Sequence, residues 1–281
     1  MTSPKLQTQT NEWGQRPFRL WLPENQAPQF LLTALHGCFM DSARMADDTN
    51  LADLVLPMGG ALLCPQQDRQ ANEWMGWNWF LPENQKTNGV GETVLLRQLI
   101  TDTLFQLKLS REASALVGIS AGSAMATNLV FNSPQLFKCV VLIAGPAFAC
   151  ARSAEEGLQA MQSGPVQKID LPNQQTLPPT LVIHGEKDSV VHASHLAELK
   201  SQWLQVWGKN GFDEKLTETD FSWCEQLIHQ GQLFFTSHLV KDMGHAWPGG
   251  KPGCDFMSPP HSEGMQIIGD FLKSAWNREP V

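Results

Sequence analysis

The sequence lacks several features that would place it in a broad class of protein. Its 281 residues contain no run of Lys or Arg, and the formal net charge is −8. A nucleic-acid-binding domain is expected to present a basic patch, so we expect no nucleic-acid partner. The acidic balance suits neutral or small substrates. No apolar stretch reaches the roughly 20 residues of a membrane span, so we also expect no membrane partner.

Signals for secretion and for a disulfide framework are also lacking. The N-terminal segment has no apolar core of about 7–15 residues of the kind found in secretory signals. We therefore expect a cytoplasmic protein, unless a signal has been removed from its start. The six cysteines include no Cys-x-x-Cys pair, and in a chain of this size disulfides are not indicated. Cys64 and Cys139 lie in apolar runs, where a free cysteine behaves as a small hydrophobic side chain.

Short apolar runs alternate with helical patterns along the chain. The runs predict strands at 18–22, 30–37, 60–66, 114–120, 139–145, 180–186 and 233–240. Apolar residues at helical spacing predict helices at 92–107, 121–132, 193–207 and 262–276. Continuous Val/Ile/Leu runs between helices indicate a mostly parallel sheet covered on both faces. With 42% hydrophobic residues, we expect one α/β domain over 1–281, with polar excursions over the sheet at about 146–179 and 208–232.

The segment "VGISAG" (117–122) matches G-x-S-x-G at a junction between a strand and a helix. This is the setting that a nucleophile elbow requires, because the serine sits on a sharp, strained turn. Gly118 and Gly122 remove side chains that would collide with the neighbouring strand and helix. The motif predicts Ser120 as a nucleophile.

Serine is a weak nucleophile unless a base removes its proton and an acid orients that base. On this type of fold the chain order is Ser, then Asp or Glu, then His. Asp188 follows the strand in "VIHGEKDSVV" (182–191) and is the preferred acid. Glu186 is the alternative, but it follows the strand so closely that we expect its side chain to point elsewhere. His245 lies in "KDMGHAWPGGK" (241–251), a loop whose glycines and proline constrain its path. We predict that Asp188 and His245 complete the site.

The other histidines have weaker settings. His238 lies inside a strand pattern, and His229 and His261 lack a position at a strand end. His192 and His195 are three residues apart, but two histidines without a third ligand are a weak metal signal. We interpret these two as solvated residues at the start of a helix, and we predict neither a metal nor a cofactor.

Acyl transfer also needs two backbone N–H groups directed at the developing oxyanion. The amide of Ala121, immediately after the nucleophile, is one candidate. The second is the amide of Cys38 in "LTALHGCFMDS" (32–42), where Gly37 provides the turn after a strand. Cys38 as the nucleophile is the competing hypothesis, but it has no elbow between a strand and a helix.

Tryptophans gather in "NEWMGWNWFLPENQ" (72–85), in a chain that has ten tryptophans and no tyrosine. Apolar rings that carry an indole N–H suit a partly wet cleft. Trp77, Asn78 and Trp79 are therefore candidates for the acyl or alcohol side of the site, and Trp247 is a similar case. Packing of a long loop by an aromatic cluster is an equally good interpretation.

Together these motifs resemble the polyhydroxybutyrate depolymerase family of α/β-hydrolase esterases, which includes feruloyl and acetylxylan esterase relatives. The matching segments are "LHGC" (35–38), "WNWF" (77–80), "GISAGSAMA" (118–126), "IHGEKDSVV" (183–191) and "GHAWPGG" (244–250). The resemblance implies an α/β-hydrolase fold and a catalytic triad of Ser120, Asp188 and His245. It also implies an oxyanion hole made by the amides of Cys38 and Ala121.

The chain departs from this family pattern at one position. Relatives often carry a cysteine before "WNWF", where this chain has Gly76. The disulfide that such a cysteine would form with Cys38 is therefore unavailable, which fits a reducing compartment. Secreted depolymerases also often carry a signal, a Thr/Pro-rich linker and a polymer-binding module, none of which we find. We expect soluble oligomers, intracellular polymer or another ester as substrate.

The sequence thus predicts a serine carboxylic-ester hydrolase that cleaves poly- or oligo-(3-hydroxybutyrate)-type esters through an acyl-enzyme. Three alternatives remain. The first is a feruloyl or acetyl esterase on small or carbohydrate esters. The second is an acyltransferase that uses the same triad. The third is a non-catalytic binding protein on a hydrolase scaffold, which would be expected to have lost a triad member.

Overall fold

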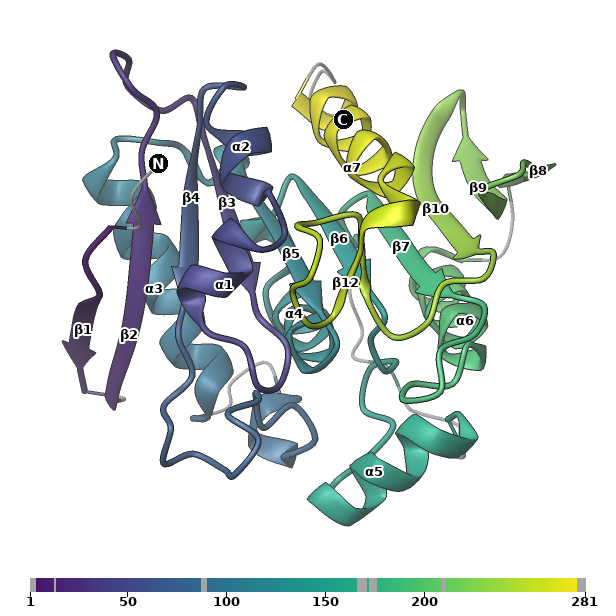
Figure 1. Cartoon of the computed structure of the whole chain (residues 1–281), viewed down its shortest axis with the longest axis horizontal. Coiled ribbons are helices and arrows are strands. Elements are labelled where there is room, and N and C mark those ends of the chain that lie inside the picture. Colours follow the sequence, from purple (N-terminus) through teal and green to yellow (C-terminus); the bar gives the residue numbers. More distant parts are fainter. Residues whose placement is uncertain are drawn as a thin grey trace.

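A ten-stranded sheet forms the centre of the protein (Figure 1). The computed structural model describes residues 4–12, 14–86, 90–165, 171, 176–208 and 211–276. In spatial order the strands are β1 (Gln7–Asn11), β2 (Gly14–Trp21), β4 (Gly60–Pro65), β3 (Phe30–Leu35), β5 (Ser114–Ile119), β6 (Cys139–Ile143), β7 (Thr180–Gly185), β10 (Gln232–Val240), β9 (Ser222–His229) and β8 (Asp213–Glu218). The strands from β4 to β10 are parallel, and those at both edges are antiparallel.

Helices cover both faces of this sheet, as Figure 1 shows. One face carries α1 (Ser42–Asp47), α2 (Leu51–Val55) and α7 (Glu263–Trp276). The other carries α3 (Glu92–Gln106), α4 (Ala121–Asn132) and α6 (Ser194–Trp207). A further helix, α5 (Ala154–Ser163), lies beyond the ends of the central strands. Short elements complete the fold: η1 (Pro82–Asn84), η2 (Arg111–Ala113), η3 (Pro134–Leu136), η4 (Pro259–His261), β11 (Trp247–Pro248) and β12 (Met257–Ser258).

The core consists of two apolar layers, one on each face of the sheet. Every residue of β3, β4, β5 and β7 is buried. Successive side chains of a strand point to opposite faces, so Leu116 packs with α3 and α4, whereas Val117 packs with the layer under α7. Because both faces are covered, these strands appear in the sequence as uninterrupted apolar runs. The α/β fold predicted from those runs is confirmed.

Two segments differ from the sequence-based expectation. The expected excursion over the sheet at 208–232 is wrong, because β8 and β9 extend the sheet as antiparallel strands beyond β10. All six residues of β8 are exposed, and such an edge strand has charged residues in place of an apolar run. The stretch 146–179 contains α5, whose start is marked by a Ser153 hydroxyl that accepts the Glu156 N–H at 3.2 Å.

Within the ranges given above, no helix is long and apolar enough to cross a bilayer.

Candidate active site

A sharp turn between β5 and α4 presents Ser120. Its backbone has φ 55° and ψ −122°, a conformation that a residue with a Cβ rarely adopts and that stores strain. A Cβ at Gly118 would overlap the carbonyl of Gly122, and a Cβ at Gly122 would overlap the carbonyls of Leu35 and His36. Gly118 therefore allows strand β5 and helix α4 to approach this closely, and Gly122 allows α4 to approach the end of β3.

Ser120, His245 and Asp188 form one hydrogen-bonded chain. The Ser120 hydroxyl lies 2.9 Å from His245 Nε2, and His245 Nδ1 lies 2.8 Å from Asp188 Oδ2. The Asp188 side chain is fully buried, whereas 10% of the His245 side chain is exposed. A carboxylate accepts the Nδ1 proton of the imidazole, which leaves Nε2 free to accept the serine proton. The structure thus brings together the three side chains that the sequence singled out.

Backbone contacts between two loops bring Asp188 and His245 together. The Lys187 N–H donates to the carbonyl of Met243 at 2.8 Å. At the end of β7, a Cβ on Gly185 would overlap the carbonyls of Met243 and Gly244, so the loop that bears His245 rests directly on the loop that bears Asp188. Farther on, Gly249 and Gly250 have φ of 96° and 83°, which explains why the chain needs glycine after "HAWP".

Asp188 is held as an anion by the groups around it. Its Oδ1 accepts the N–H groups of Val190 and Val191 at 2.9 and 2.8 Å. Its Oδ2 lies 3.4 Å from Nε2 of the buried His184. Burial by itself would raise the pKa of Asp188, but the hydrogen bonds from His184, His245 and the Val191 amide outweigh it and hold the pKa well below its usual range.

The alternatives to these residues lie elsewhere. Glu186 is exposed and accepts the N–H of Asp242 at 3.1 Å. His238 hydrogen-bonds Ser222 at 2.9 Å within the sheet. The interpretation of His192 and His195 as two solvated residues is wrong for His195, which is fully buried. In the part of the chain that the structure describes, no group of three or more His, Cys, Asp or Glu side chains is arranged to hold a metal ion.

Ser120 opens into a cavity of about 390 Å³. Its wall is mostly aromatic and aliphatic and includes Phe39, Met40, Trp74, Trp77, Trp79, Phe80, Leu158, Met161, Val190 and Phe256. Among the described residues, no Asp, Glu, Lys or Arg lines it. A cavity of this kind accommodates an apolar, uncharged group next to the serine.

Two of the four predicted substrate-binding residues line this cavity and two do not. Trp77 and Trp79 form part of its wall. Asn78 instead uses its side-chain oxygen to accept a hydrogen bond from Asn72 at 2.9 Å. Trp247 is fully buried in the layer under α7, and its indole N–H meets the sulfur of Met265 at 3.0 Å. The structure therefore does not place Asn78 or Trp247 in the cavity wall, because a hydrogen bond within the loop holds the first side chain and core packing holds the second.

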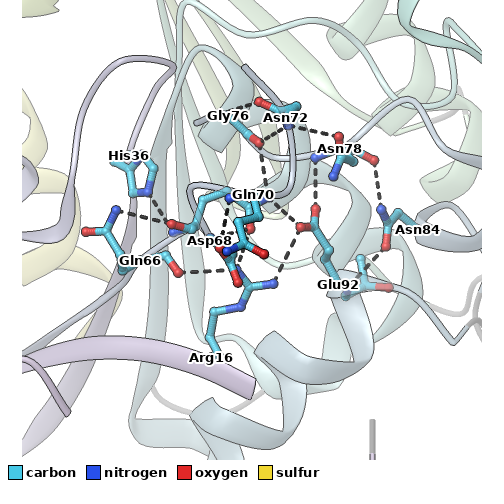
Figure 2. A network of polar contacts seen from close by, with 12 residues as sticks. Arg16, His36, Gln66, Asp68, Gln70, Asn72, Gly76, Asn78, Asn84 and Glu92 are labelled. Atoms are coloured by element: carbon cyan, nitrogen blue, oxygen red, sulfur yellow. Dashed lines mark hydrogen bonds and ion pairs between the residues drawn. The ribbon is translucent and has the colours of Figure 1, made fainter. Parts of the chain in front are cut away.

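A buried polar network holds the tryptophan-bearing loop in place (Figure 2). The Glu92 carboxylate accepts the Asn78 N–H at 2.8 Å, hydrogen-bonds Gln67 and pairs with Arg16 at 3.5 Å. Gln67 also donates to the carbonyl of Gly76 at 3.0 Å, and the Arg16 guanidinium lies 5.1 Å from the ring centre of Trp77. Arg16, Gln67 and Glu92 are far apart in the sequence and match no local motif, so sequence reasoning missed them.

His36 joins this network to the turn after β3, which carries the oxyanion-hole candidate Cys38. Its Nδ1 donates to the Gly37 carbonyl at 2.8 Å, and its Nε2 accepts the Gln67 N–H at 3.1 Å. The indole of Trp77 donates to the His36 carbonyl at 2.9 Å. Burial lowers the pKa of His36 to about 4, so the ring is neutral at pH 7 and can accept one hydrogen bond while it donates another.

Cys38 and Ala121 lie around the nucleophile. A Cβ at Gly37 would be 3.4 Å from the Cβ of Ser120, and one at Gly76 would be 3.6 Å from the Cβ of Ala121 and in overlap with Cys38 Sγ. Neither the Cys38 N–H nor the Ala121 N–H donates to another residue among those described. Burial raises the pKa of the Cys38 thiol to about 11, which disfavours the thiolate that a cysteine nucleophile requires.

Comparison with known proteins assigns the chain to a family. The family model for the esterase PHB depolymerases matches residues 17–217. The chain belongs to this family of carboxylic ester hydrolases. The match covers the elbow, the Asp188 loop and the tryptophan loop, and ends before His245.

Curated proteins similar to this chain are acetylxylan esterases by name. It is 22% identical over 242 residues to a probable acetylxylan esterase A of Neosartorya fischeri, covering 78% of this chain and 64% of that relative. The chain therefore spans less than two thirds of that relative's length. The acetylxylan esterase of Aspergillus awamori superposes with a TM-score of 0.74 at 18% identity, over 95% of this chain and 99% of that one. Est1E from Butyrivibrio proteoclasticus superposes with a TM-score of 0.58 at 9% identity, over 97% and 99%. These superpositions support the α/β-hydrolase fold.

Gly76 provides a test of the pocket geometry. The backbone of Gly76 has no positive φ and its Cβ position overlaps Cys38 Sγ, so a cysteine there is placed to bond with Cys38. We expect Gly76→Cys to form a disulfide with Cys38 and to raise the free energy of unfolding by up to about 4 kcal/mol, because a loop of this length is closed in the unfolded chain.

The measurement for this prediction is urea unfolding of Gly76→Cys with and without reductant, together with a peptide map of the oxidised protein. The double variant Cys38→Ala/Gly76→Cys is the control and should gain nothing on oxidation. If the thiols at positions 38 and 76 of Gly76→Cys both stay reduced in air, the two positions do not meet in solution.

Proposed function

We propose that the protein is a serine carboxylic-ester hydrolase in which Ser120 is the nucleophile, His245 the general base and acid, and Asp188 the orienting carboxylate. The observation that carries this proposal is the hydrogen-bonded chain of 2.9 and 2.8 Å from Ser120 through His245 to Asp188, at the base of an apolar cavity. The strained backbone of Ser120 supports it, because such strain is retained where the surrounding structure requires it.

Acylation would begin when His245 Nε2 takes the Ser120 proton and Oγ attacks the ester carbonyl carbon. The buried anionic Asp188 stabilises the imidazolium that results. The carbonyl oxygen becomes an oxyanion, for which the amides of Cys38 and Ala121 are the proposed donors. Collapse of the tetrahedral intermediate breaks the bond to the alcohol oxygen, and His245 returns the proton to that oxygen as it leaves.

Deacylation would follow the same path with water. His245 removes a proton from the water, whose oxygen attacks the acyl carbon, and the same two amides hold the second oxyanion. When this intermediate collapses, Ser120 Oγ leaves and takes the proton back from His245. The acid is released and the site returns to its starting state without a cofactor.

The cavity supports esters of apolar acids as substrates. It provides aromatic and aliphatic surface and no charged side chain among its described lining residues. Hydroxybutyrate units are uncharged along an ester chain and present methyl groups, so we propose poly- or oligo-(3-hydroxybutyrate)-type esters as the first substrate class. Feruloyl or acetyl esters are the alternative, which the tryptophan-rich wall and the names of the relatives favour. An acyltransferase would use the same Ser120 chemistry with an alcohol or amine in place of water.

The test combines active-site labelling with a substrate panel. A fluorophosphonate should label the protein at Ser120, as read by mass spectrometry of the peptide. The panel contains p-nitrophenyl esters of increasing acyl length, 3-hydroxybutyrate oligomers, amorphous polymer and methyl ferulate, each with and without an added acceptor alcohol. Release of 3-hydroxybutyrate supports the first substrate class, and cleavage of the aryl or feruloyl esters alone replaces it by the second. Failure to label and to cleave any ester would contradict the proposal.

A further inference from the structure

Helix α5 forms one wall of the cavity but is weakly packed against the body of the protein. Ala154, Gly157, Leu158 and Met161 of this helix line the cavity. Of its ten residues, only Gly157 and Ala160 are buried, so little apolar surface fixes the position of the helix. Gly157 packs next to the ring of Trp79, because a Cβ there would lie 3.4 Å from that ring, in van der Waals contact. The position of α5 therefore sets the size of the cavity opposite the tryptophans.

Polar contacts from the start of α6 hold the C-terminal end of α5. The fully buried ring of His195 donates from Nε2 to the Ala160 carbonyl at 2.7 Å. The N–H of His192 donates to the Met161 carbonyl at 2.7 Å. The Ala160 carbonyl also accepts the N–H of Gly164, the C-cap residue of α5, at 2.9 Å. The bonds from His195 and His192 therefore tie this end of α5 to the start of α6, in addition to the helix's own cap.

His195 also fixes the segment that leads from β6 to α5. Its Nδ1 accepts the Ala147 N–H at 3.1 Å. Two turns farther along α6, the buried amide of Gln202 pairs with both the N–H and the carbonyl of Phe148, each at 3.1 Å. One imidazole thus connects the beginning of this segment to the end of α5. Only a neutral ring with the proton on Nε2 makes both bonds, and burial, which lowers the pKa of His195 to about 4, keeps the ring neutral.

We propose that His195 is a positioning residue that determines which acyl groups the enzyme accepts, by fixing the α5 wall of the cavity. This inference rests on the proposed esterase function. An acetyl group occupies only a small part of a cavity of about 390 Å³ and stays beside Ser120. A longer acyl chain must extend along the wall, so its binding depends on where Leu158 and Met161 lie. His195 itself lines no part of the cavity and acts through α5.

The test compares His195→Phe and His195→Gln with wild type on p-nitrophenyl acetate and p-nitrophenyl octanoate. Phenylalanine provides an aromatic ring without a donor or acceptor and so leaves the buried Ala147 N–H unpaired. Glutamine can donate and accept hydrogen bonds in place of the imidazole. We expect His195→Phe to retain kcat/KM for the acetate within about threefold and to lose about tenfold or more for the octanoate, mainly through KM. His195→Gln should recover most of that loss.

Hydrogen exchange provides a readout that does not depend on turnover. Peptides that cover α5 should exchange faster in His195→Phe than in wild type, whereas those that cover β5 and α4 should not change. The matched control is His229→Phe, which removes a ring-to-carbonyl bond of the same kind (2.6 Å to Gly211) in β9. This control should leave both substrates and the exchange of α5 unchanged.

Two results would overturn the inference. Unchanged exchange of α5 in His195→Phe would show that the residue does not hold this wall. Equal losses on the two esters would show a general structural role and no effect on acyl selectivity. If wild type cleaves no ester at all, the proposed function and the selectivity claim both fall, while the exchange of α5 still decides whether His195 anchors the helix.

Discussion

Replacement of Ser120 by alanine should lower kcat for any ester that the protein cleaves by about 10⁴- to 10⁶-fold. The reason is that His245 Nε2 lies 2.9 Å from the hydroxyl and Asp188 lies 2.8 Å from the other ring nitrogen, and this arrangement has no nucleophile to activate once the oxygen is gone. The measurement is single-turnover and steady-state hydrolysis of the best ester from the panel by wild type and variant.

The variant Ser120→Gly separates chemistry from folding. Because Ser120 has φ 55°, glycine should relieve backbone strain and raise the free energy of unfolding by about 1 kcal/mol, while activity falls as far as in the alanine variant. Circular dichroism and urea unfolding of both variants serve as the control for folding. Activity near that of wild type in folded Ser120→Ala would remove Ser120 from the mechanism.

Acidification should destabilise the fold strongly between about pH 6.5 and about pH 4. His36 and His195 are fully buried, and burial lowers the pKa of each from 6.5 to about 4. Above pH 6.5 both rings are neutral in the folded and unfolded states. Below it the unfolded chain binds protons that the folded protein does not, so the free energy of unfolding falls until the folded rings also titrate. Each group contributes a loss on the order of 3 kcal/mol, against a typical total of about 5–15 kcal/mol.

The measurement is urea unfolding at several pH values across this range, for wild type and for His36→Gln. The glutamine side chain can still donate to one partner and accept from another but does not titrate, so the variant should lose less stability on acidification. Burial raises the pKa of Glu198, and this group acts in the opposite direction. A free energy of unfolding that stays constant or rises from pH 7 to pH 4.5 would contradict the prediction.

The parts of the site that were predictable from the sequence are those that one loop determines by itself. Gly118 and Gly122 lie two residues before and two residues after the serine that they allow to turn, and the glycines around His245 lie within six residues of it. Because these requirements involve residues close together in the chain, they produce short motifs that can be recognised in the sequence. Asp188 was preferred over Glu186 by its distance from the strand end, and the structure places Asp188 against His245 at 2.8 Å.

The parts that were not predictable depend on contacts between distant segments. Nothing in "HAWPGG" indicates that the indole of Trp247 turns into the core to meet Met265, because an indole suits a wet cleft and a packed layer equally well. The Arg16, Gln67 and Glu92 network joins three elements separated by tens of residues. Helix α5 had a recognisable start at Ser153 and Glu156, yet its short apolar stripe did not stand out from its polar surroundings.

The uncharged cavity has a consequence for the catalytic cycle as a whole. In the proposed mechanism, hydrolysis of the acyl-enzyme turns a neutral ester into a carboxylate, and among its described residues the cavity offers that charge no Lys or Arg side chain. Transfer of an unpaired carboxylate from water to apolar surroundings is strongly unfavourable, so the product is bound more weakly than the substrate from which it came. Under the proposed mechanism, the charge created by hydrolysis therefore favours release of the product into water.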